Sequence, residues 1–131
     1  MFSRWKTNVK PNSSKQVIGK EGEDAACKYL QKEGFHIQER NFRTRFGEID
    51  IVAKRGGEYY FIEVKTRTQG GFGESIESLP PYRVARFQKM VVAYASRHKL
   101  MEKALHLSLL GIDQNAKNSG ITFIKDIVGV V

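Results

Sequence analysis

The sequence has little of several features that define whole classes of protein. Cys27 is its only cysteine, which excludes a disulfide-stapled fold and makes a reducing compartment the expected one. No segment approaches the roughly 20 consecutive apolar residues of a membrane-spanning helix. Residues 1–15 are charged and lack the apolar run of a secretory signal. We therefore expect a cytoplasmic protein that contacts no membrane.

Acidic residues are also scarce relative to basic ones. The 131 residues include 22 Lys and Arg against 14 Asp and Glu, a formal net charge of +8. Such an excess favours binding to the phosphate backbone of nucleic acids, although charge that serves only solubility is an open alternative. The length suits one domain with a substantial core. We predict a mobile basic tail over residues 1–15 and a single domain over residues 16–131.

Hydrophobic periodicity predicts two helices and five strands. Apolar residues recur at helical spacing from Gln16 to Gly34 and again after Pro80-Pro81. Strand-like patterns are expected over residues 35–43, 48–53, 59–64, 105–113 and 121–130. The glycine-rich segment 69–75 is predicted to be a flexible loop, and it lacks the lysine of a nucleotide-binding motif. The order α-β-β-β-α-β-β predicts an α/β fold in which helices cover the faces of a mixed sheet.

The second and third predicted strands form the stretch that is most informative about function. They are joined through residues 56–57, a Gly-Gly pair typical of a tight β-hairpin turn. A turn centred there places Asp50 opposite Glu63 and Glu48 opposite Lys65, with all four side chains on one face. Opposed residues lie about 5 Å apart, so the two carboxylates repel unless a proton, a lysine or a divalent cation offsets their charge.

This polar face has two competing interpretations. In the first, Asp50 and Glu63 hold Mg²⁺ or Mn²⁺, and the carbonyl of Val64 adds a further oxygen ligand. Lys65 would then steady an attacking hydroxide and the negative charge that grows on phosphorus. In the second, the face is a surface ladder with cross-strand ion pairs, such as Glu48 with Lys65. The three histidines lack ligand spacing, and one cysteine cannot form a zinc cluster.

Several motifs resemble those of a known family. The segments GEID and FIEVKTR, preceded by GKEGEDAACKYLQKEGF and RNFR, resemble the YraN family of predicted endonucleases. That family is similar to archaeal Holliday-junction resolvases within the PD-(D/E)XK nuclease superfamily, which has a restriction-endonuclease-like fold. The resemblance implies that Asp50 is the metal-binding aspartate and that Glu63 and Lys65 form the (D/E)XK pair. It also implies that Glu23 is the carboxylate contributed by the first helix.

Two positions depart from the family's usual pattern. Arg83 stands at the start of the second helix, where the family usually has a lysine. Ser108 stands in the penultimate strand, where the family usually has an aspartate. Arginine keeps the charge of lysine but presents it with a different donor geometry, so the first departure changes how an anion would be held.

Together the pattern and the resemblance predict a Mg²⁺- or Mn²⁺-dependent endonuclease that acts on DNA, with branched DNA among its candidate substrates. A homodimer is an open alternative to a monomer. The predicted catalytic residues are Glu23, Asp50, Glu63 and Lys65, and the predicted metal ligands are Asp50, Glu63, Val64 and Glu23. Phosphate contacts are expected from five arginines: Arg43, Arg45, Arg67, Arg83 and Arg86. The competing prediction is a non-catalytic nucleic-acid-binding module, or a scaffold in a DNA-processing complex.

Overall fold

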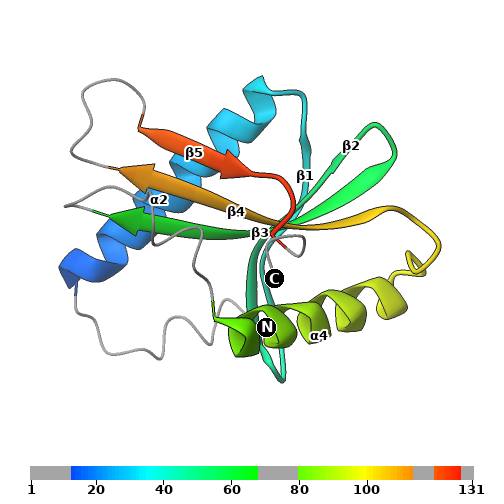
Figure 1. The fold of residues 1–131 in the computed structure, drawn as a ribbon. Helices are drawn as coiled ribbons and strands as arrows, with labels where there is room; N and C mark the ends of the chain where they lie inside the picture. The colour runs from blue at the N-terminus through cyan, green and yellow to red at the C-terminus, as the bar shows by residue number, and fades with distance from the viewer. Residues whose placement is uncertain (1–12, 68–79, 114–119, 128–131) are drawn as a thin grey trace.

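The described residues form a mixed five-stranded sheet with a helix on each face (Figure 1). A computed structural model describes residues 13–67, 80–113 and 120–127. Its elements are α2 (Ser13–Lys32), β1 (His36–Thr44), β2 (Gly47–Arg55), β3 (Glu58–Arg67), α4 (Pro81–Arg97), β4 (Leu105–Asp113) and β5 (Ile121–Ile124). The strand order is β1-β2-β3-β4-β5, and neighbours are antiparallel except for the parallel pair β3 and β4. The predicted element order and mixed sheet are confirmed.

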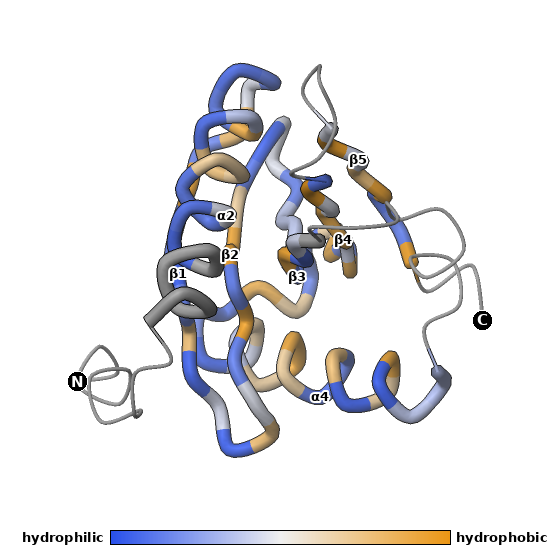
Figure 2. The backbone as a smooth tube through the Cα atoms, turned by 90° about the vertical axis from the view of Figure 1, so that its left-hand side faces the viewer, coloured by the Kyte–Doolittle hydropathy of each residue, from blue (hydrophilic) through white to orange (hydrophobic). Residues whose placement is uncertain are grey.

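Each face of the sheet is buried against one helix. On one face Val52 and Phe61 pack against an apolar stripe of α4: Val84, Phe87, Met90, Val91, Tyr94 and Ala95. On the other face Ile51 and Ile62 pack against Ala26, Cys27 and Leu30 of α2. Figure 2 shows apolar residues along the middle strands and hydrophilic residues along much of α2. Both described helices are thus amphipathic, and neither is long and apolar enough to cross a membrane.

The β2–β3 hairpin has the predicted turn. Gly56 and Gly57 both have positive φ angles, 60° and 78°, as the central residues of a type I′ turn require. Residues 51–55 of β2 pair with residues 58–62 of β3, in the register that a turn centred on these glycines demands. Near the turn, therefore, local sequence determines which residues face each other.

The two strands separate beyond that paired segment. β3 continues beside β4 as far as Arg67, whereas β2 continues beside β1, where Glu48 pairs with Arg43. The predicted pairing of Glu48 with Lys65 is therefore wrong, and the predicted pair of Asp50 and Glu63 also lies just beyond the paired segment, which ends at Ile51 and Ile62. β1 and β2 run on to their own turn beside α4 (Figures 1 and 2). The hairpin is thus closed at its glycine turn and open at the end that carries the predicted site.

Three predicted segments differ from the structure or fall outside it. α2 begins at Ser13, so the end of the predicted tail 1–15 belongs to a helix, and residues 1–12 lie outside the described residues. The predicted loop 69–75 lies outside them as well. β5 ends at Ile124, because the chain bends at Lys125, so a strand over 121–130 was too long.

Candidate functional site

Beyond the last paired residues of β2 and β3, the side chain of Asp50 replaces a backbone carbonyl as the hydrogen-bond acceptor for β3. Hydrogen-bonded pairs alternate along a two-residue hairpin, and Val64 is the next β3 residue whose N–H and C=O point toward β2. The Val64 N–H donates to Asp50 Oδ2 at 2.8 Å. Because the two backbone groups of one strand residue point the same way, the Val64 carbonyl also faces the gap between the strands. A carboxylate and a carbonyl therefore line the open end of the hairpin.

β1 is irregular where it passes Asp50. Asn41 has a φ of 57°, in the left-handed region that residues in a strand rarely adopt. Its two neighbours in β1 pair with the residues on either side of Asp50, so Asn41 faces Asp50 across the strands. β1 is thus distorted at the point where it passes Asp50. Distortion of this kind is common beside functional side chains, which it helps to orient.

Asp50 lies in a crowded negative environment. Burial is the main reason that the pKa of Asp50 rises from 3.8 to about 7, and the charges of Glu23, Glu63 and Glu48 add to the rise. The hydrogen bond from Val64 acts in the opposite direction. Carboxylates from α2, β2 and β3 are therefore close enough to influence one another. Positive charge placed at the open end would offset their repulsion.

Two cations neutralise Glu63. Arg83, in the first turn of α4, places Nη2 2.7 Å from Glu63 Oε2, and Lys65 places Nζ 3.5 Å from the same oxygen. All three side chains are 29–30% exposed, so solvent reaches them but does not screen them fully. Arg83 reaches Glu63 from a helix distant in sequence. The structure thus joins α4 to the hairpin through this ion pair.

Glu23 is brought to the sheet by the close packing of α2. Gly22 lies so tightly against β3 that a Cβ at this position would collide with Thr66 Oγ1. The next residue, Glu23, places Oε1 3.6 Å from Nη2 of Arg40, which also donates to Asp24 Oδ1 at 2.9 Å. The absence of a side chain at position 22 is therefore what lets the helix carboxylate approach the hairpin.

Arg40 and Asn41 are neighbours of the site that sequence reasoning did not single out. Both belong to the RNFR motif of β1, whose position just before GEID was the available signal. Within the described part of the chain, the buried Nε of Arg40 has no hydrogen-bond partner. Arg40 therefore holds Glu23 and Asp24 through one end of its guanidinium and retains an unused donor.

The oxygen donors at the open end fit a hard cation in their chemistry. Among the described residues, no three His, Cys, Asp or Glu side chains already surround a metal position. The candidate donors are the carboxylates of Asp50 and Glu63 and the carbonyl of Val64, and Mg²⁺ and Mn²⁺ prefer such oxygens. A cation bound there would share the carboxylate of Glu63 with Arg83 and Lys65, both of which contact its Oε2.

The predicted phosphate-binding arginines do not form one group. Arg83 lies against the candidate site, and Arg86 is exposed on α4. Arg43 and Arg45 are exposed beside the β1–β2 turn. Arg67 is the last residue of β3. The predicted set therefore divides between the open end of the hairpin and a separate region.

The departure from the family pattern at Ser108 has a structural role. Ser108 is fully buried, and its Oγ donates to the carbonyl of Lys125 at 2.6 Å. The hydroxyl thus ties β4 to the chain that follows β5, and it lies outside the carboxylate cluster. The departure at Arg83 is different, because that side chain contacts Glu63 directly.

The fold and the open hairpin define a class of protein. It is an α/β domain with a mixed sheet, in which β2 and β3 diverge next to a cluster of carboxylates and a lysine. Residues 22–119 match a family described as "Uncharacterised protein family UPF0102". The chain belongs to this family, and the predicted resemblance to the YraN family is thereby confirmed.

Relatives match most of the chain. A UPF0102 protein of Persephonella marina is 38% identical over 99 residues, which cover 76% of this chain and 85% of that protein. A UPF0102 protein of Caldicellulosiruptor saccharolyticus is 32% identical over 115 residues, which cover 86% and 98%. Among solved structures, Pyrococcus furiosus SfsA in complex with Ca²⁺ is similar with a TM-score of 0.39 and 14% identity, over 86% of this chain and 64% of that one. A likeness that remote carries no argument about function.

Proposed function

We propose that this protein is a metal-dependent endonuclease that hydrolyses phosphodiester bonds in DNA, with branched DNA among its candidate substrates. One observation carries the proposal: a half-buried aspartate, Asp50, sits at the open end of the hairpin among other carboxylates, beside Glu63 and Lys65, in a chain of net charge +8. A negative cluster within a basic protein favours a divalent cation at the cluster and a phosphate backbone around it. The resemblance to PD-(D/E)XK nucleases supports the same conclusion.

Each side chain has a separate role in this proposal. Asp50, Glu63 and the Val64 carbonyl would hold Mg²⁺ or Mn²⁺, and Glu23 would complete the negative set from α2. The bound cation supplies polarisation of a phosphoryl oxygen and a water of lowered pKa. Lys65 lies on the same face as Glu63, two residues along β3, and its ammonium stabilises the negative charge that develops on the phosphate oxygens.

In this proposal Arg83 pairs first with Glu63 and then with a phosphate of the DNA. Its guanidinium neutralises Glu63 in the structure. With a cation bound by the carboxylate, the guanidinium of Arg83 would be free to hold a phosphate oxygen, which its fork of donors suits. The arginine at this position therefore keeps the site from carrying unbalanced negative charge before substrate and cation arrive.

The proposal is tested by cleavage of labelled junction, duplex and single-stranded DNA in Mg²⁺ or Mn²⁺. We expect the wild type to cleave at least one substrate, and Asp50→Asn and Lys65→Ala to lose activity by on the order of 100-fold or more. Glu21→Gln and Lys28→Ala, which change the same charges on the exposed side of α2, should cleave like the wild type. Absence of cleavage under every condition, or unchanged cleavage in both site variants, would overturn the proposal.

A non-catalytic nucleic-acid-binding module is the second candidate. It is favoured by one contact pattern: Arg83 and Lys65 both form ion pairs with Glu63, as they would in a purely structural cluster. This function requires DNA binding that weakens with salt but is indifferent to Mg²⁺ and to Asp50→Asn. DNA affinity measured with and without Mg²⁺ separates the two, because only the nuclease couples Asp50 to the cation.

A further inference from the structure

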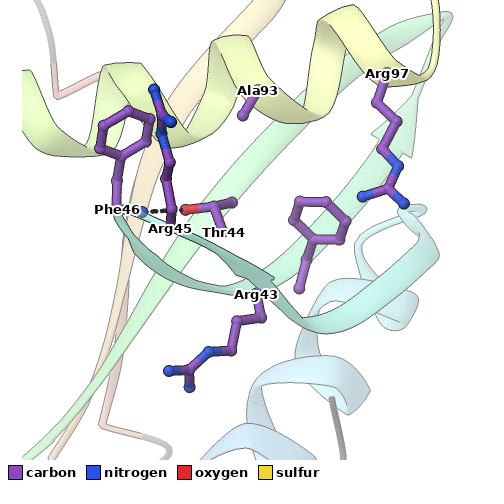
Figure 3. Close-up of a pocket in the computed structure, with 7 residues that line it drawn as sticks. Arg43, Thr44, Arg45, Phe46, Ala93 and Arg97 are labelled. Carbon is purple, nitrogen blue, oxygen red and sulfur yellow. Dashed lines mark hydrogen bonds between the residues drawn. The ribbon is translucent and has the colours of Figure 1, made fainter. Parts of the chain in front are cut away.

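A basic region separate from the candidate site lies toward the C-terminal end of α4. There α4, the end of β1 and the β1–β2 turn line a pocket of about 410 Å³ that is open to solvent (Figure 3). Its lining residues include no acidic side chain: Phe42, Arg43, Thr44, Arg45, Phe46, Ala93 and Arg97. Arg97 extends from α4 toward β1, Arg45 and Phe46 stand beside the helix, and Arg43 points to the other side of the turn (Figure 3). Arg45 and Arg97 are thus the cations on the helix side of this pocket.

The Phe46 ring lies close to two cations, Arg45 and Lys89. The guanidinium carbon of Arg45 lies 5.1 Å from the centroid of the Phe46 ring, and Lys89 Nζ lies 5.6 Å from it. The backbone that carries this ring is constrained, because the Phe46 N–H donates to Thr44 Oγ1 at 3.0 Å and that hydroxyl donates to the Gly47 carbonyl at 2.9 Å. Cation–π contacts to the ring favour positions of the two cations beside it. The turn and the helix therefore present their charges together.

α4 is basic along one side without a compensating acid. None of its 17 residues is acidic. Arg86, Lys89, Ala93 and Arg97 recur at spacings of three or four residues, so they lie on one side of the helix, and Arg83 borders them. The three cations of this stripe are exposed. Positive charge thus runs along α4 from the candidate active site to the pocket, a length of about 21 Å between positions 83 and 97.

We propose that Arg45, Phe46, Lys89 and Arg97 form a second DNA-backbone site, the α4–turn surface, which binds phosphates away from the scissile bond. Duplex DNA carries one negative charge per about 1.7 Å of its axis, so a row of cations about 21 Å long can meet several phosphates. Contacts of this kind hold the register of the duplex without reading bases. Phe46 is a positioning residue, because it acts through the two cations beside it.

The inference rests on the proposed function, because that function fixes where the scissile phosphate lies. Binding of the DNA backbone to the α4–turn surface, however, needs no metal. Fluorescence anisotropy with a labelled duplex in EDTA therefore isolates it. The test variant is the triple Arg45→Gln/Lys89→Gln/Arg97→Gln. The matched control is Lys20→Gln/Lys28→Gln/Lys32→Gln, because these lysines are exposed on α2 and their loss changes the net charge equally.

We expect the α4–turn triple variant to bind the duplex at least about tenfold more weakly than the wild type at low salt. Its slope of log affinity against log salt should fall by about two to three, since each phosphate contact contributes about 0.9. The α2 control should keep both the affinity and the slope close to wild type. Phe46→Leu, which retains apolar bulk but removes the ring, should weaken binding by less than the triple variant does.

Three results would overturn the α4–turn surface: no duplex binding by the wild type in EDTA, wild-type binding by the triple variant, or equal losses in both triple variants. Failure of the nuclease proposal looks different. A wild type that binds the duplex but never cleaves in Mn²⁺ contradicts the nuclease, and the comparison of the two triple variants in EDTA still decides the surface. A triple variant that binds and cleaves like an active wild type contradicts the surface alone.

Discussion

The two ends of β3 each carry a cluster of charged side chains, and the clusters are built differently. At the start of β3, Glu58 and Asp126 flank one imidazole: His106 Nε2 lies 2.6 Å from Glu58 Oε1, and Nδ1 lies 2.7 Å from Asp126 Oδ1. His106 also stacks on Tyr60, with ring centroids 4.5 Å apart. Each carboxylate there has a hydrogen-bonding partner, and both side chains are near half exposed.

At the far end of β3 the charges conflict instead. The pKa of Glu58 is lowered, chiefly by its hydrogen bond to His106, whereas burial and neighbouring carboxylates raise the pKa of Asp50. The first cluster thus stabilises the charged form of Glu58, whereas the surroundings of Asp50 disfavour its charged form. A carboxyl group whose surroundings disfavour its charged form is typical of binding and catalytic sites. The contrast supports the proposed site at the open end and a structural role for the His106 cluster.

The largest expected effect is on the cleavage rate, and it should differ between variants of the two clusters. Lys65→Ala should lower the cleavage rate by on the order of 100- to 1000-fold, since it removes the ammonium beside the developing charge. Asp126→Asn, at the other end of the sheet, should leave the rate unchanged. Single-turnover cleavage of the best substrate measures both variants. Equal losses in the two variants would mean that the clusters do not differ in function.

Asp50→Asn should change stability in a pH-dependent way. Between the ordinary pKa of 3.8 and the folded value of about 7, the folded protein keeps a proton that the unfolded chain releases, so stability falls as pH rises through this interval. Asparagine removes that penalty. Denaturant unfolding should show the variant gaining on the order of a few kcal/mol over the wild type above pH 7, with the gain shrinking toward pH 4. A difference that is constant with pH would contradict the electrostatic origin.

Gly22→Ala tests how the carboxylate of α2 reaches the open end. The added Cβ collides with Thr66 Oγ1, so stability should fall by about 1–3 kcal/mol and Glu23 should move away from the hairpin. Thr66→Ala in the same background removes the colliding oxygen and should restore most of the loss. Thermal unfolding of both single variants and the double variant measures the coupling. Additive losses would show that this contact is not the constraint.

Glu58→Gln has the smallest expected effect and the opposite sign to Asp50→Asn. Because the folded pKa of Glu58 lies below its ordinary value of 4.5, its contribution is present above that pH and is lost as pH falls through the folded value. Melting temperatures of variant and wild type should therefore differ slightly near neutral pH and converge in acid. A Glu58→Gln variant that melts higher than the wild type near neutral pH would remove the contrast between the clusters.

Local patterns predicted the parts of the fold that local contacts decide. The Gly-Gly turn set the register of residues 51–55 against 58–62, and alternation predicted β4 at its observed bounds. The sequence did not predict where β2 leaves β3, because that depends on β1 and on packing against α4. The pairing of Glu48 with Lys65 failed for this reason.

The candidate site was predictable as a set of residues but not as an arrangement. Spacing predicted Asp50 opposite Glu63, although the observed pairing of β2 with β3 ends one residue earlier, at Ile51 and Ile62, whereas Glu23 was implied only by the family resemblance. Its approach depends on the contact between Gly22 and β3, which no periodicity reveals. The ion pair of Arg83 with Glu63 likewise joins residues from different elements. Contacts that depend on helix placement need the three-dimensional fold.

Mn²⁺ binding measured by calorimetry above pH 7, where Asp50 is ionised, tests most directly whether the open end of the hairpin is a cation site. We expect the wild type and Glu58→Gln to bind Mn²⁺ alike, and Asp50→Asn to lose that binding. Binding that survives Asp50→Asn, or no binding by the wild type, would contradict the cation site and leave the open end without its proposed function.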